Sequence, residues 1–172
     1  MRNRTVTVLT ATVLGLVAGS VLAADPPHAA AKPVSAVIAV PMLSSAGAAK
    51  VLAAAVTEAN RHNWGSSIAI VDAAGHLLAY QRTDGAPLGT IDVARRKAET
   101  SIKFKAPTEF LQKMVSQGGA AMLTLGDYVA VVGGYPITVN GEVVGAIGVS
   151  GGMAGEDEVV AKAGLAALGA GG

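Results

Sequence analysis

The run from Gly133 to Gly152, GGYPITVNGEVVGAIGVSGG, constrains the fold of this chain more than any other stretch. Two apolar segments rich in β-branched residues flank Asn140-Gly141, a dipeptide that suits the positive φ angles of a type I′ turn. The run therefore predicts a β-hairpin. A glycine-rich turn follows it and leads into a helix predicted from about Gly155 to Leu168.

The rest of the chain alternates hairpin and helix patterns. Apolar spacing and breakers predict helices over 45–62, 92–104 and 108–116, and strands over 66–72, 76–82 and 128–132. Consecutive hairpins disfavour a parallel Rossmann sheet. We expect an α+β fold, in which an antiparallel sheet of about five strands packs against helices.

The N-terminus is typical of a secretory signal. Arg2 and Arg4 precede an apolar stretch from Thr5 to about Val17, and Val21-Leu22-Ala23 suits signal cleavage. We expect residues 1–23 to be a Sec-type signal peptide, which would place the mature protein in the periplasm or outside the cell. The alternative is an N-terminal membrane anchor.

Residues 24–41 are rich in proline and alanine. They predict a flexible arm, or one that docks on a neighbouring copy, with a short edge strand over Val37–Val40. The remaining residues, 42–172, are predicted to form a single domain.

The composition of the chain disfavours some classes of binding partner and of metal ligand. Removal of Arg2 and Arg4 with the signal leaves a net charge of about −1. Nucleic-acid binding is disfavoured, because it needs a basic surface. The chain has no cysteine, which excludes disulfides and thiolate ligands. With 51% hydrophobic and only 3% aromatic residues, the core must be built from Ala, Val, Leu and Ile.

Three segments together resemble the GlcG/HbpS family of haem-binding proteins. They are VDAAGHLLAYQRTDGAPLGTIDVARRKAETS (71–101), APTEF (106–110) and the stretch from Gly133 to Leu168. The same segments are similar to the C-terminal domain of some cobalamin adenosyltransferases. The resemblance covers roughly residues 43–168. It implies a profilin-like sandwich that assembles into homo-oligomers and binds haem or its iron.

The resemblance also implies site residues on the helix over 92–104. Lys97 and Thr100 match the family's Lys-Ala-x-Thr element, and Lys97 is a candidate partner for haem propionates. The exposed face of a solvated helix is the alternative interpretation. Arg95, Arg96 and Lys103 supply further cations there. Thr108 matches a family position as well, either as a helix cap or as an oxygen ligand.

The turn before the last helix is the other candidate site. Gly151 and Gly152 permit close approach of a ligand carboxylate to backbone N–H groups. Asp157 matches the family's acidic position. The alternative is that the turn only begins a capped helix.

Histidine, Met, Cys and Tyr are the usual protein ligands of haem iron. His28, His62 and His76 are far apart in sequence and lack the spacing of a zinc site. A structural role is the simpler interpretation for each. The iron ligand and any catalytic residues therefore stay unknown at the level of the sequence.

These observations predict an exported, oligomeric haem-binding protein for haem sequestration, sensing or turnover. Two alternatives stay open. One is an enzyme or binding protein for a small carboxylate or diol of glycolate-type metabolism. The other is a module whose oligomer surface contacts a membrane sensor.

Overall fold

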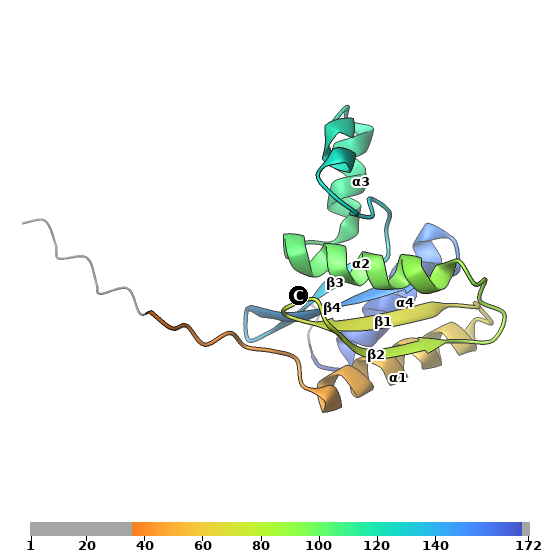
Figure 1. Cartoon of the computed structure of the whole chain (residues 1–172). Helices are drawn as coiled ribbons and strands as arrows, with labels where there is room; N and C mark the ends of the chain where they lie inside the picture. The colour runs from red at the N-terminus through yellow and green to blue at the C-terminus, as the bar shows by residue number, and fades with distance from the viewer. Residues whose placement is uncertain (1–35, 170–172) are drawn as a thin grey trace, which may run out of the picture. The chain divides into compact units, whose positions relative to one another are not determined.

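A computed structural model describes residues 36–169 of the chain (Figure 1). In chain order the elements are α1 (Ser45–Arg61), β1 (Ser67–Asp72), β2 (Leu77–Arg82), α2 (Thr90–Phe104), α3 (Thr108–Ser116), the 3-10 helix η1 (Ala120–Thr124), β3 (Gly134–Val139), β4 (Glu142–Ser150) and α4 (Ala154–Ala166). The predicted signal peptide and most of the predicted arm lie outside the described residues. None of the described helices combines the length and the apolar character needed to cross a bilayer.

The α+β class is confirmed, but the sheet has four strands rather than about five. Its strand order is β2-β1-β4-β3, and every neighbouring pair is antiparallel. Helices α1 and α4 cover one face and α2 covers the other (Figure 1). The profilin-like arrangement that the resemblance implies stays a prediction.

The predicted hairpin is present as β3 and β4. Asn140 and Gly141 join the strands with φ angles of 51° and 80°, both in the left-handed region that a type I′ turn needs. Because this turn fixes the register, Ile137, Ile147 and Val149 all lie in the core beneath α1 and α4.

The predicted strand over 128–132 is wrong, and helix side chains explain the difference. The Val129 N–H donates to Thr100 Oγ1 at 3.1 Å, and the Val132 N–H donates to the Gln112 side chain at 3.1 Å. Side chains of α2 and α3 thus accept the hydrogen bonds of backbone N–H groups that would otherwise bond to a neighbouring strand. The short edge strand predicted over Val37–Val40 is wrong too, because no strand is formed there.

Small residues set the distance between α2 and the sheet. Gly148 on β4 faces α2 so closely that a Cβ there would overlap the carbonyl oxygen of Ala94 and lie 2.5 Å from the Ala98 nitrogen. Both alanines are fully buried. Glycine and alanine at these three positions therefore allow α2 to lie almost directly on β4.

Helix α3 and η1 extend away from the sandwich (Figure 1). They carry apolar side chains that are about half exposed or more, including Phe110 at 50%, Leu123 at 52% and the following Leu125 at 61%. Exposed apolar groups in one region are characteristic of contact surfaces.

Candidate functional site

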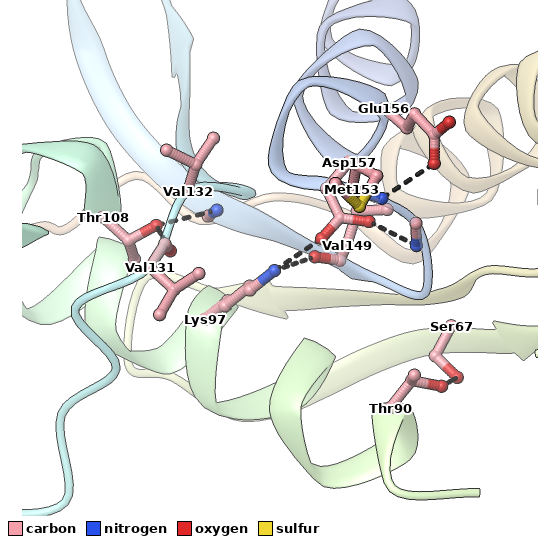
Figure 2. A network of polar contacts seen from close by, with 12 residues as sticks. Ser67, Thr90, Lys97, Thr108, Val131, Val132, Val149, Met153, Glu156 and Asp157 are labelled. Atoms are coloured by element: carbon pink, nitrogen blue, oxygen red, sulfur yellow. Dashed lines mark hydrogen bonds and ion pairs between the residues drawn. The ribbon is translucent and has the colours of Figure 1, made fainter. Parts of the chain in front are cut away.

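Lys97 is the centre of a buried polar network. It lies on the face of α2 that packs against the sheet, and the residue is only 1% exposed. Its Nζ donates to Asp157 Oδ2 at 2.7 Å and to the carbonyl oxygen of Val149 at 2.8 Å (Figure 2). The interpretation of Lys97 as part of a solvated helix face is therefore wrong, because its charge is paired inside the protein.

Asp157 supplies the other half of the ion pair from the first turn of α4. Its second oxygen, Oδ1, accepts a hydrogen bond from the Gly152 N–H at 3.1 Å. Burial raises the pKa of Asp157, while hydrogen bonding and charge from Lys97 and the Gly152 amide oppose this rise. The pair therefore ties α2 to the end of β4 and the start of α4.

The turn at Gly151 and Gly152 begins α4, as one of the two sequence interpretations predicted. The Met153 N–H donates to Glu156 Oε2 at 2.7 Å, so two successive amides of the turn already bind the protein's own carboxylates. A Cβ at Gly151 would overlap the Gly65 carbonyl oxygen. The two glycines thus serve close packing, and a ligand carboxylate would have to displace Asp157 or Glu156.

Thr108 is buried at the first position of α3. Its Oγ1 donates to the Val131 carbonyl oxygen at 2.6 Å and accepts from the Gly134 N–H at 3.0 Å. The predicted helix cap is wrong, since Pro107 occupies the cap position and no side chain caps this helix. Thr100 and Thr108 instead hold the segment that leads into β3.

Gly133 and Gly134 connect the threonine contacts with the ion pair. A Cβ at Gly133 would lie 2.8 Å from Lys97 Nζ, and one at Gly134 would lie 2.6 Å from Thr108 Cγ2. The chain therefore passes between these two side chains at a place where only glycine fits. Sequence reasoning missed both glycines as site residues, although two successive glycines before a strand indicate a close backbone approach.

The structure thus brings all six predicted residues into one region. Asp157 forms hydrogen bonds with both Lys97 and Gly152, and Gly151 is the next residue along the chain. Thr108 contacts the first residue of β3, and Thr100 contacts Val129 in the segment before that strand. Figure 2 shows Lys97, Asp157 and Thr108 in this region. Both side chains of the ion pair are at most 5% exposed. In this conformation the network organises the backbone and offers no free ammonium to an outside ligand.

The histidines lie elsewhere. His62 stacks on Trp64 with ring centroids 4.0 Å apart and lies 3.2 Å from Glu58. His76 is exposed and lies 3.6 Å from Asp72. His28 is outside the described residues. Within residues 36–169 no three His, Asp or Glu side chains are grouped so that they could hold a metal ion.

The other cations of α2 are exposed. Arg95 pairs with Glu99 at 3.3 Å, which partly neutralises the acidic group in the Lys-Ala-x-Thr element. Lys103 lies over the Tyr128 ring, with Nζ 5.8 Å from the centroid. Arg96 is exposed and forms no ion pair within the described part of the chain.

Comparison with known proteins decides the family. The family model described as "Haem degrading protein HbpS-like" matches residues 43–166, most of the chain. The chain belongs to this HbpS-like family. The resemblance seen in the sequence is therefore confirmed, and the matched residues include the whole sandwich and its buried network.

Individual relatives support the same family assignment. Protein GlcG of Escherichia coli K12 is 38% identical over 110 residues, which cover 63% of this chain and 81% of GlcG. The crystal structure of a double mutant of HbpS from Streptomyces reticuli has a TM-score of 0.71 at 36% identity, over 81% of this chain and 98% of the other.

A further solved structure is a haem complex of PduOC. It has a TM-score of 0.70 at 30% identity and covers 76% of this chain and 97% of the other. The corrinoid adenosyltransferase PduO of Salmonella typhimurium is 34% identical over 109 residues, which is 32% of its length. The chain therefore resembles one part of that longer protein.

Proposed function

We propose that this chain is an exported, oligomeric haem-binding protein that takes part in haem sequestration, sensing or turnover. One observation carries the proposal: PduOC, a structural neighbour at 30% identity that covers 76% of this chain, is known as a complex with haem. Membership of the HbpS-like family supports the same function.

The buried network has a positioning role in this proposal. Lys97 and Asp157 hold the ends of β4 and α4, and Thr108 holds the entry to β3. A buried ion pair is costly to separate, so these side chains fix the backbone around them. Direct contact of Lys97 with a haem propionate, predicted from the resemblance, would require this pair to open.

Exposed groups near the network are the better candidates for direct contact. Arg96 and Lys103 on α2 can form charge-assisted hydrogen bonds with propionates. Phe110, Leu123 and Leu125 expose apolar surface on and after α3, which suits both the porphyrin ring and a second copy of the chain. We propose that haem is held at or near a contact between copies.

The export proposal rests on the sequence of residues 1–23, and a periplasmic or extracellular location follows from it. We also propose that the apolar surface on and after α3 contacts a membrane sensor. The small-carboxylate alternative is less favoured, because Asp157 and Glu156 occupy the amides of the turn that was expected to bind the anion.

A haemin titration of the mature protein from Ala24, followed by the Soret band and by size-exclusion chromatography, tests the proposal. Saturable binding at a fixed stoichiometry per chain supports it. Arg96→Ala with Lys103→Ala should weaken binding, while Lys50→Ala, on an exposed position of α1, is the matched control. Haemin uptake that does not saturate and does not exceed a nonspecific background would refute it.

The role of the network is tested in the same titration. Thr108→Val removes the hydroxyl, and Thr108→Ser keeps it. If Thr108 only positions the backbone, both variants should keep the Soret maximum of the wild type, provided that they fold. The Val variant should then bind haemin more weakly than the Ser variant. A shifted Soret maximum in the Val variant alone would instead indicate that the hydroxyl is an iron ligand.

A further inference from the structure

A groove follows the free edge of the sheet, on the side away from β1. It has a volume of about 700 Å³ and runs between Pro107 before α3, strand β3 and the second half of α4. Its walls include Tyr135, Pro136 and Leu165. This volume is within the range of small-molecule sites, which are mostly apolar with a few polar groups.

Tyr135 is the unusual member of the wall. The residue is only 6% exposed, and its hydroxyl is buried without a hydrogen-bond partner in the part of the chain that the structure describes. It is the single buried side-chain polar atom in that part for which this is so. Buried hydroxyls normally have a partner, since an unsatisfied one destabilises the fold. The missing partner is what a bound molecule would supply.

Charges near the hydroxyl limit the kind of partner. Burial raises the pKa of Tyr135 above its usual range, and the charges of Glu158 and Glu109 raise it further. Glu158 also acts as a weak acceptor for the hydroxyl, but the two groups do not meet hydrogen-bond geometry. The phenol therefore stays protonated and can donate a hydrogen bond. The same two carboxylates disfavour a negatively charged group beside it, so the acceptor should be uncharged.

Lys162 is a flexible, charged member of the groove wall. It lines the groove, and its side chain is 62% exposed and paired with Glu158 at 2.6 Å. Exposed ion pairs contribute little to stability. A ligand that enters the groove can therefore displace the Lys162 side chain at small cost.

We propose that the groove along β3 binds an uncharged molecule with an apolar body and one hydroxyl or carbonyl oxygen, which accepts a hydrogen bond from Tyr135. The apolar body lies against Pro136 and Leu165. The site uses none of the residues of the buried network and does not depend on haem binding.

Two naphthalene probes of the same size test the proposal at pH 7: 2-naphthol, which is uncharged, and 2-naphthoate, which is negative. Binding to the mature protein is measured by ligand-observed NMR and by probe fluorescence. We expect saturable binding of 2-naphthol and weaker binding of 2-naphthoate. No saturable binding of 2-naphthol, or stronger binding of 2-naphthoate, would overturn the proposal.

Tyr135→Phe fills the same space without the hydroxyl. It should weaken 2-naphthol binding by about three- to ten-fold, the worth of one hydrogen bond. Because the hydroxyl is unpartnered in the free protein, the variant should melt at or above the wild-type temperature. Equal affinity in the variant, or a lower melting temperature, would contradict the assigned role.

Ala166→Phe provides a second variant, because Ala166 is an exposed residue of the groove wall and its replacement should fill the groove. Ala53→Phe, on an exposed position of α1, is the matched control. Loss of 2-naphthol binding in the first variant and not in the second supports the location. Unchanged binding in Ala166→Phe would exclude it.

Discussion

The ammonium group of Lys97 and the carboxylate of Asp157 form an ion pair of 2.7 Å across 60 residues of sequence, with side chains only 2% and 5% exposed. Each charge is buried only because the other is present. The pair joins α2 to α4 across the end of the sheet, and its energetics can be tested directly.

Lys97→Met should destabilise the protein by about 3–5 kcal/mol, because it leaves the carboxylate of Asp157 buried and unpaired. Lys97→Met with Asp157→Leu removes both charges and should recover most of that loss. Urea unfolding followed by circular dichroism measures both variants. If the losses in free energy of unfolding of the two single variants add up in the double variant, the two groups do not stabilise each other.

The pH dependence of the free energy of unfolding shows whether folding raises or lowers the pKa of Asp157. A carboxyl group whose pKa is higher in the folded state than in the unfolded state binds its proton more tightly when folded. Its contribution to stability is therefore present below the unfolded pKa and is lost as the pH rises through the folded pKa.

The measurement compares wild type with Asp157→Asn between pH 3 and pH 7. The stability of the wild type relative to the variant should decrease as the pH rises. An increase over the same range would mean that Lys97 outweighs burial and lowers the pKa.

Thr108→Val should destabilise the fold by about 1–3 kcal/mol, because the Val131 carbonyl and the buried Gly134 N–H both lose their partner. Thr108→Ser retains the hydroxyl and should cost clearly less. Chemical denaturation ranks the two variants. Hydrogen exchange at Gly134 should accelerate in the Val variant alone, and equal protection in both would argue against the proposed contact.

Gly148→Ala should be strongly destabilising, because its Cβ would overlap the Ala94 carbonyl oxygen and force α2 away from the sheet. Gly155→Ala is the matched substitution. It lies in the first turn of α4 with no atom within 4 Å of the added Cβ, and should be neutral or stabilising by up to about 1 kcal/mol. A thermal melt of both variants measures the contrast; similar melting temperatures would contradict the close packing of α2 on β4.

Local sequence chemistry was sufficient for most elements. Asn140-Gly141 predicted the turn between β3 and β4. The two serines at 44 and 45 are both suitable N-caps for α1, and Ser44 takes this role by accepting a hydrogen bond from the Gly47 N–H. These features depend on neighbours in the chain, so periodicity and turn preferences reveal them. The motifs from Val71 to Leu168 were also enough to indicate the family.

The tertiary structure decided what these residues do. The segment 128–132 has the composition of a strand, yet side chains of Thr100, Thr108 and Gln112, distant in sequence, take its hydrogen bonds. Lys97 has the sequence context of an exposed cation, yet it is buried because the carboxylate of Asp157 pairs with its charge. Local patterns were thus enough for most elements and for the family. Which polar groups are buried depends on long-range pairing, because their partners come together only in the folded chain.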